Sequence, residues 1–528
     1  MIGGGVGEQQ GLVFDRVWGS RTGRREFLLG GLALLGAGAV ARVQARPRWN
    51  VGSPFALGVA SGDPSHDGVV LWTRLAPDPL IDGGMPPDPV EVRWEIGDDD
   101  TMTRIVKAGR STAIAAWAHS VHVEAEGLEP NRPYWYRFHA GDATSPIGRT
   151  RTLPRTGDDV NRLRFAFASC QHYETGFFTA YRHMAAEDLD VMFHLGDYIY
   201  EGAGRDGLPR QHHGLELATL QDYRTRYAQY KLDPDLQAAH AAFPWIVTTD
   251  DHEVDNNYAG AISENDDPRE AFLQRRAAAY QAYYEHMPLR RRSVPMGPGI
   301  RLYRQFTYGR LASFFVLDTR QFRSDQACGD GLKAPCPAQS DAARTMMGAE
   351  QERWLFDGLA RSKRQWNVLA QQVMMAKVDQ APGPEERYSM DQWSGYDAGR
   401  TRLLEFLGSR RPANPIVLTG DIHSNWVNDL KVDFRAAASP AVGTEFVGTS
   451  IASGGDGTDQ APRLTDVLAE NRFVKFQNSQ RGYVSCAVTR EAWHADYQVL
   501  DYVSRAGAPR RTRASFKVAR GRAGAERL

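Results

Sequence analysis

Between residues 55 and 154 the chain alternates apolar and polar positions with the period of a β-strand. The runs at 69–75, 90–96, 120–128 and 134–140 show this alternation, and turn clusters such as Gly62-Asp63-Pro64 separate them. Several short alternating strands at this spacing are typical of a β-sandwich. We therefore predict that residues 46–155 form a small all-β domain with a structural or spacing role.

A different pattern begins after the polar linker at residues 155–159. Helical stretches at 220–230, 269–286 and 348–361 now alternate with short apolar runs. The runs lie at 163–169, 190–195, 244–249, 311–317, 365–370 and 415–419. Strands that alternate with helices predict an α/β domain, with a mixed or parallel sheet covered on both faces. We assign residues 156–515 to this domain and the last residues, 516–528, to a solvated, arginine-rich tail.

Groups able to bind metal ions follow these apolar runs. They are Cys170, Asp197, Asp251, Asp421 and His423. Because α/β folds place ligand-binding groups beyond the carboxyl ends of their strands, we expect these side chains to converge on one sheet edge. Tyr200, three residues after Asp197, can reach the same ion. A thiolate, a phenolate, an imidazole and a carboxylate together suit iron, whereas further carboxylates suit calcium or manganese.

The first 45 residues resemble a twin-arginine export signal. Arg24-Arg25 precede an apolar run at 32–40, and Val43-Gln44-Ala45 has the small residues of a cleavage site. The alternative is a membrane anchor, but the run is shorter than the roughly 20 residues needed to span a bilayer. We expect the twin-arginine translocation machinery to export the chain to the periplasm, the cell wall or the medium, without a stable membrane anchor after cleavage.

Composition narrows the possible partners. The chain is 42% hydrophobic and 24% charged, as in soluble globular proteins. Its formal net charge of −1 gives no electrostatic argument for binding nucleic acid. The composition indicates no oligomeric state.

Several motifs together resemble the alkaline phosphatase D family of the metallophosphoesterases. The matching stretches are FALGVASGDPSHDGVVLWTRL, FASCQHYETGFF, HLGDYIYE, TTDDHEVDNNY, MDQWSGY and VLTGDIHSNW. They run from Phe55 to Trp426, and their order and spacing match as well. The resemblance implies a metallophosphoesterase-like β-sandwich flanked by helices. The segment from Leu128 to Tyr136 in turn resembles the tyrosine corner of fibronectin-type domains. A fibronectin- or Ig-like domain is therefore expected before the metallophosphoesterase-like domain.

The related purple acid phosphatases suggest roles for individual residues. Their Asp-x-x-Tyr, Gly-Asn-His-Glu and Gly-His-x-His motifs are matched by residues 197–200, 250–253 and 420–423. The resemblance implies a ferric ion held by Cys170, Asp197, Tyr200 and His423. Asp251 and Asp421 would hold one or two calcium ions, with Asp197 bridging. Gln371 and Gln372 stand where the purple enzymes have a histidine, which favours calcium at the second site; zinc or manganese is the alternative.

The expected activity is the hydrolysis of phosphomonoesters and phosphodiesters by a metal-activated hydroxide, with His252 facing the phosphate as an acid–base group. One alternative is a dedicated phosphodiesterase, resembling phospholipase D in acting on lipid or cell-wall diesters. Another is a non-enzymatic surface-binding protein, which the complete set of metal donors argues against.

The remaining polar and aromatic residues have structural interpretations. Cys328 and Cys336 flank a short loop, and in an exported protein a disulfide between them is expected. We interpret Cys486 as a buried free thiol, Asp250 as a helix cap, and His212-His213 as a pair in a surface loop. Trp393 and Tyr396 fit a substrate mouth and a packed loop equally well.

Overall fold

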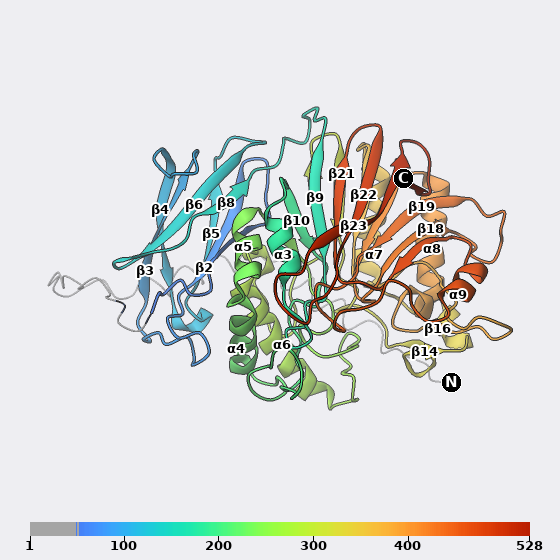
Figure 1. Ribbon diagram of the computed structural model, residues 1–528, viewed down its shortest axis with the longest axis horizontal. Coiled ribbons are helices and arrows are strands. Elements are labelled where there is room, and N and C mark those ends of the chain that lie inside the picture. The colour runs from blue at the N-terminus through green and yellow to red at the C-terminus, as the bar shows by residue number, and fades with distance from the viewer. Residues whose placement is uncertain (1–48, 50–51) are drawn as a thin grey trace, which may run out of the picture. The chain divides into compact units, whose positions relative to one another are not determined.

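The strands of the computed structural model, which describes residue 49 and residues 52–528, fall mainly into two large sheets (Figure 1). The predicted export signal at residues 1–45 lies outside the described residues. Among the residues described, no helix has the length and apolar character needed to cross a membrane.

The larger sheet carries the first strands of the predicted α/β domain at its centre. In spatial order its ten strands are β24 (Glu526–Arg527), β23 (Arg510–Ala519), β22 (Ala492–Leu500), β21 (Gly482–Val488), β9 (Leu163–Ala168), β10 (Val191–His194), β11 (Trp245–Val247), β1 (Val59–Gly62), β2 (Gly68–Arg74) and β5 (Ser120–Glu126). Strands β9, β10 and β11 run parallel, so their carboxyl ends share one edge.

The second sheet has seven strands and repeats this arrangement. Its spatial order is β12 (Arg304–Tyr308), β13 (Ala312–Val316), β15 (Trp366–Ala370), β17 (Pro415–Thr419), β19 (Ala441–Val447), β18 (Asn425–Lys431) and β20 (Val474–Asn478). Strands β13, β15, β17 and β19 are parallel. All six apolar runs predicted as strands are therefore strands.

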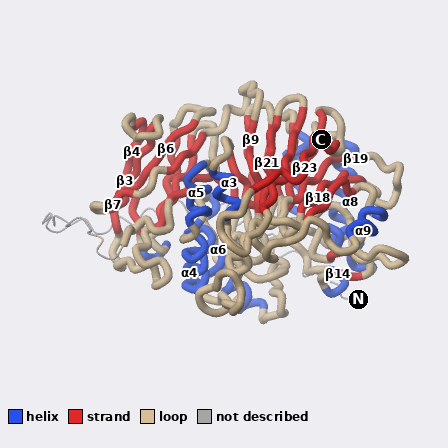
Figure 2. The backbone as a smooth tube through the Cα atoms, in the orientation of Figure 1, coloured by secondary structure: helices blue, strands red, loops and turns tan. Residues whose placement is uncertain are grey.

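The two sheets pack face to face and are covered by helices on their outer faces. Phe165 and Phe193 of the first sheet meet Phe314 of the second in the core between them. Helices near β9–β11 cover the first sheet, and α7 and α8 cover the second (Figures 1 and 2). The helices are α3 (Thr179–Ala185), α4 (Leu220–Lys231), α5 (Pro234–Ala242), α6 (Arg269–His286), α7 (Gly348–Arg361), α8 (Asp397–Arg410) and α9 (Leu464–Glu470). The predicted α/β class is confirmed.

The N-terminal strands also form a sandwich, but its two sheets differ in origin. One sheet contains β4 (Ile105–Ala113), β3 (Val90–Gly97), β6 (Pro133–Ala140), β7 (Ala143–Thr144) and β8 (Gly148–Arg151). The other layer is β1, β2 and β5, which continue the ten-stranded sheet because β1 pairs with β11. The Tyr134 hydroxyl bonds the backbone of Glu129 at 2.8 Å, as a tyrosine corner does. The fibronectin-like assignment and the domain limits stay predictions.

A buried lysine lies where α4 meets this N-terminal layer. The Lys231 ammonium is 4.2 Å from the centre of the Trp72 ring on β2. Burial lowers the pKa of Lys231 from 10.5 to about 7, because a charged ammonium loses its hydration there.

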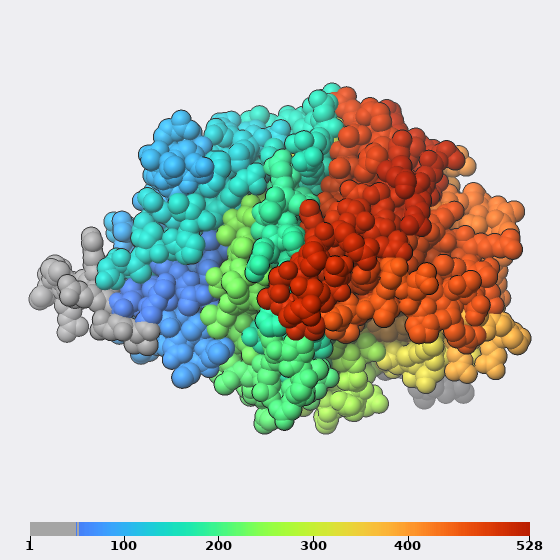
Figure 3. All heavy atoms as spheres, in the orientation of Figure 1, coloured from blue at the N-terminus to red at the C-terminus, as the bar shows by residue number. Residues whose placement is uncertain are grey.

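The C-terminal residues do not form the solvated tail predicted for residues 516–528. Strands β23 and β24 pair with each other and β23 pairs along β22, and Figure 3 shows these residues within the packed surface. Ala514, Phe516 and Val518 are buried, while Arg510 and Arg511 at the start of β23 are exposed. The prediction of a tail was therefore wrong, because these residues form the last two strands of the larger sheet.

Of the other structural predictions, those for the cysteines are confirmed and that for His212-His213 is wrong. Cys328 and Cys336 form the predicted disulfide, in a loop with the short strands β14 (Leu332–Lys333) and β16 (Tyr388–Ser389). Cys486 is a buried free thiol in β21. His213 is exposed, but His212 is buried and bonded to the Tyr230 hydroxyl at 2.9 Å, so the pair is not a surface pair.

Candidate metal centre

The predicted metal donors follow the carboxyl ends of β9, β10 and β17. Cys170, Asp197, Asp421 and His423 each have a positive φ, of 60°, 57°, 66° and 55°. Residues other than glycine rarely adopt a positive φ, and those that do are concentrated at functional sites. Here it turns each donor sharply away from the direction of its strand.

Gly196 permits the closest approach in these turns. Its φ is 113°, and a Cβ placed there would lie 2.4 Å from the Cβ of Asp250. A side chain at this position would push the loop after β11 away from Asp197. The glycine before Asp197 thus lets two strand ends approach each other.

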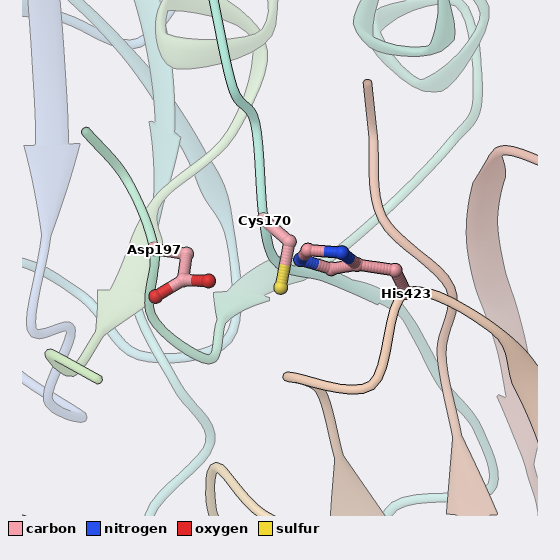
Figure 4. A group of neighbouring side chains, drawn as sticks. All are labelled: Cys170, Asp197 and His423. Atoms are coloured by element: carbon pink, nitrogen blue, oxygen red, sulfur yellow. The ribbon is translucent and has the colours of Figure 1, made fainter. Parts of the chain in front are cut away.

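Three predicted donors from distant parts of the sequence meet in one group. A ligand atom from each of Cys170, Asp197 and His423 lies within 4.8 Å of the other two, and Figure 4 shows the three side chains directed toward one another. The Tyr200 hydroxyl donates to Asp197 Oδ2 at 2.8 Å and lies 3.2 Å from His423 Nε2. These four side chains form what we call the thiolate cluster.

A second set of carboxylates adjoins the thiolate cluster. Asp197 also lies in a group with Asp251 and His252, and Asp251 lies in another with Asp250 and Asp421. Asp197 therefore belongs to both sets, as a bridging ligand would. We call Asp250, Asp251 and Asp421 the carboxylate cluster.

Asp250 is not the cap that the sequence indicated. Its Oδ1 accepts a hydrogen bond from Arg320 Nε at 2.6 Å, and it is buried beside Asp251. Burial, reinforced by Asp251 and only partly offset by Arg320, raises the pKa of Asp250 to about 7.

The donors fit cations on two independent grounds. Asp197 Oδ1 and Asp251 Oδ1 are buried and make no hydrogen bond with any described residue, although buried polar atoms normally have partners. In addition, burial raises the pKa of Cys170, of Asp197 and of Asp421 well above their usual values, and neighbouring carboxylates add to the effect. Without a cation such groups hold protons, and a metal ion takes the place of those protons.

His252 is held at the rim of the two clusters by a carboxylate that the sequence analysis missed. Its Nδ1 lies 2.7 Å from Glu201 Oε2, and its ring centre is 4.1 Å from that of Tyr200. Burial lowers the pKa of His252, but Glu201, Asp251 and Asp197 outweigh burial and raise it well above the ordinary value. Glu201 directly follows Tyr200 in the sequence, which was the available signal.

Arg320 was also missed, and it supplies the only guanidinium inside the carboxylate cluster among the described residues. Its Nε bonds Asp250, and its Nη1 bonds Asp391 Oδ1 at 2.7 Å. Its Nη2 has no hydrogen-bond partner and lies 3.6 Å from Asp251 and 3.7 Å from Asp421. Arg320 comes two residues after Asp318, at the end of β13, where the apolar run pointed to this edge.

The glutamines and the aromatic residues singled out in the sequence are all buried. The Gln371 amide oxygen accepts from Trp393 Nε1 at 3.1 Å, and that of Gln372 accepts from the Thr319 hydroxyl at 2.7 Å. Each oxygen thus accepts a hydrogen bond within the fold, and the preference for calcium drawn from these glutamines stays a prediction. Trp393 and Tyr396 are fully buried, which identifies a packed loop rather than a substrate mouth.

Two family models match the chain. The model of the PhoD-like phosphatase covers residues 165–497, and that of its N-terminal domain covers residues 41–154. The chain belongs to the PhoD-like phosphatase family. This confirms the resemblance to alkaline phosphatase D and identifies the chain as a phosphatase, a hydrolase acting on phosphate esters.

Individual members of the PhoD-like phosphatase family are similar over most of the chain. Alkaline phosphatase D of Bacillus subtilis (strain 168) is 53% identical over an alignment of 507 positions, which covers 93% of this chain and 87% of that protein. A solved structure of PhoD matches with a TM-score of 0.89 at 54% identity, covering 91% of this chain and 93% of the other. Both predicted clusters lie within the range of the catalytic family model.

Proposed function

We propose that this phosphatase is an exported, metal-dependent phosphoesterase that hydrolyses phosphomonoesters and phosphodiesters. The observation that supports it most is the sharing of Asp197 between the thiolate cluster and the carboxylate cluster. Two adjoining sets of donors with a common carboxylate suit two or more cations close together. In this proposal export follows the twin-arginine route, to the periplasm, the cell wall or the medium.

The donor chemistry supports different metals in the two clusters. Cys170, Tyr200 and His423 offer sulfur, phenolic oxygen and nitrogen, which suit Fe³⁺, whereas Asp251 and Asp421 offer only oxygen, which suits Ca²⁺ or Mn²⁺. Burial lowers the pKa of His423 to about 3, so its imidazole is neutral and able to bind a metal. Bound cations would neutralise phosphoryl oxygens and lower the pKa of a water molecule.

His252 would move the proton that the reaction requires. Glu201 engages Nδ1 and keeps the ring protonated, so Nε2 carries a proton directed away from Glu201. The side chain is 19% exposed and can therefore meet a substrate. We assign it to hydrogen bonding with a phosphoryl oxygen and to protonation of the leaving group. Replacing His252 with alanine should lower turnover and leave the metal content unchanged.

Elemental analysis of the protein, purified after export and without chelators, tests the metal assignment. We expect iron near one per chain together with calcium. Cys170→Ser should lose the iron, whereas Cys486→Ser, at the other buried free cysteine, should retain it. Retention of iron by Cys170→Ser would remove the thiolate from the site. Two zinc or manganese ions without iron would preserve the hydrolase but contradict the assignment of iron.

Substrate preference needs a separate comparison. Hydrolysis of p-nitrophenyl phosphate and of bis(p-nitrophenyl) phosphate by the same preparation should proceed with both compounds. Hydrolysis of the diester alone would establish the alternative, a dedicated phosphodiesterase.

A further inference from the structure

An open pocket lined by cations lies at the end of the sheets opposite the metal centre. Its volume is about 410 Å³, within the size range of ligand sites. The charged residues lining it are Arg310, Lys363, Arg364, Arg490, Arg520 and Asp159. The whole chain has 63 basic and 64 acidic residues, so this local excess does not follow from its composition.

The topology places these residues far from the catalytic edge. Arg310 precedes β13, Arg364 precedes β15 and Asp159 precedes β9, so all three lie at the amino ends of parallel strands. Arg490 follows β21, which runs antiparallel to β9, and therefore reaches the same end. A strand of six residues such as β9 is about 20 Å long. The pocket and the metal centre are thus separated by about the length of a strand.

Most of these cations lack counter-charges. Arg490 pairs with Asp159. By contrast, Arg310, Lys363, Arg364 and Arg520 have no ion-pair partner, and their side chains make no hydrogen bond with any residue from 52 to 528. Burial together with the neighbouring Arg310 lowers the pKa of Arg364. The two guanidinium groups therefore repel each other, and neither has an ion-pair partner among the described residues, an arrangement that an anion would stabilise.

We propose that this pocket is a second, non-catalytic site that binds a ligand with several phosphate groups. Guanidinium groups match the tetrahedral oxyanion geometry of phosphate and bind it through paired hydrogen bonds. Four cations without partners suit a multiply charged ligand better than a single phosphate ion. The proposal does not depend on the metals or on the proposed substrates, because no residue of the pocket belongs to either cluster.

The test uses inositol hexasulfate as the probe, because it carries several tetrahedral oxyanions but no phosphate ester to hydrolyse. Binding is measured by isothermal titration on the whole protein and on two double variants. Arg310→Gln/Arg364→Gln removes two pocket cations, and Arg353→Gln/Arg472→Gln removes two exposed, unpaired arginines elsewhere in the described chain. Because a charge-assisted contact changes affinity by about tenfold, the pocket variant should bind about 100-fold more weakly. The control should bind like the wild type.

Three further readouts separate the proposal from a structural role. Without ligand the pocket variant should unfold at the same temperature as the wild type or higher, since it relieves like-charge repulsion. Its turnover of p-nitrophenyl phosphate should be unchanged. Its affinity for the probe should fall less steeply with added salt than that of the wild type, because two of the charges that salt screens are gone. Equal binding by all three proteins would overturn the proposal. Lys363→Gln, which removes a pocket cation at an exposed position, is compared as well. If both the pocket variant and Lys363→Gln unfold at a lower temperature than the wild type, these cations stabilise the fold, and that result would also overturn the proposal.

Competition then identifies the source of the phosphate groups. Inorganic tripolyphosphate and long-chain polyphosphate are titrated against bound hexasulfate. More effective displacement by tripolyphosphate, compared per phosphate group, indicates a compact ligand, and the reverse indicates a polymer. Failure of both to displace the probe contradicts the phosphate class. The phosphate compounds can also chelate the metals of the two clusters. This effect is the same in the pocket and control variants, so the difference between the two variants excludes it.

Discussion

Replacement of Arg320 with methionine tests whether its guanidinium compensates the carboxylate cluster. The substitution removes hydrogen bonds to Asp250 and Asp391 at 2.6 and 2.7 Å. Arg320 is fully buried, and removing one partner of a buried ion pair costs about 3–5 kcal/mol, because the carboxylates stay buried without a counter-charge. We expect the unfolding free energy of the chelator-treated protein to fall by about this amount.

The pH dependence of this loss has a definite sign. Arg320 lowers the pKa of Asp250, which is nevertheless about 7, so removing the arginine raises that pKa further. The folded variant then binds more protons than the unfolded chain between about pH 4 and the raised pKa. Its stability must therefore fall as the pH rises through this interval. The destabilisation should be small near pH 4 and largest under alkaline conditions.

Denaturant unfolding at pH 5, 7 and 9 measures the effect, with and without added calcium. Calcium should restore part of the lost stability if a cation can replace the guanidinium. Arg400→Met is the matched control, because Arg400 is a buried arginine that forms an ion pair with Asp397 at 2.5 Å, and neither residue belongs to the clusters. Its loss of stability should not respond to calcium. A pH-independent loss in Arg320→Met, or equal responses of the two variants to calcium, would refute the reasoning.

Three other predictions follow from the described contacts. Glu201→Gln should lower the pKa of His252, so that turnover declines at a lower pH on the alkaline side of a pH–rate profile; an unchanged profile would remove the pair from the mechanism. Lys231→Met should stabilise the fold by up to roughly 5 kcal/mol at or below pH 7, and the gain should vanish by about pH 10.5, where the unfolded lysine also loses its proton; calorimetry across this range measures it. Removing the Cys328–Cys336 disulfide, with its sequence separation of 8 residues, should cost about 2–3 kcal/mol in denaturant unfolding; equal stability of the Cys328→Ser/Cys336→Ser protein would contradict this.

The sequence was sufficient for the strands and for the donors that follow them. A period-two or continuous apolar run ending in Cys170, Asp197 or His423 predicts both the strand and the edge at which its last residues lie. This local signal does not depend on knowing how the strands are ordered. It also supplied Tyr200, since three residues beyond Asp197 is within reach of the same ion.

The residues that support the donors could not be found in the same way. Arg320 contacts Asp250 and Asp391 across separations of 70 and 71 residues, and no local pattern encodes those approaches. The pairing of β1 with β11, which joins the N-terminal sandwich to the larger sheet, is likewise a tertiary contact of one register position. Strand β23 was missed for a different reason: three of its ten residues are arginines, and positions near the edge of a sheet tolerate such charges.

The charges of the candidate site explain why its residues suit bound cations. Glu201 is balanced by protonated His252, and Asp391 by Arg323 at 2.9 Å. Arg320 alone then pairs with Asp250, Asp251 and Asp421, and Asp197 adjoins them without a guanidinium of its own among the described residues, so that three negative charges of the four stay without a counter-charge. The protein by itself can meet this deficit only with protons, and the pKa is raised at three of these carboxyls, those of Asp197, Asp250 and Asp421.

Cations with a total charge of three or more remove the need for those protons. Once they bind, the thiol of Cys170 and the phenol of Tyr200 can also ionise, which adds two negative charges and calls for still more positive charge. A single divalent ion would leave the site undercharged. Four carboxylates, a thiolate and a phenolate are offset by one guanidinium, and a trivalent ion with a divalent neighbour balances the negative charge that is left. The charge balance of the described side chains therefore favours at least two metal ions, independently of the family to which the chain belongs.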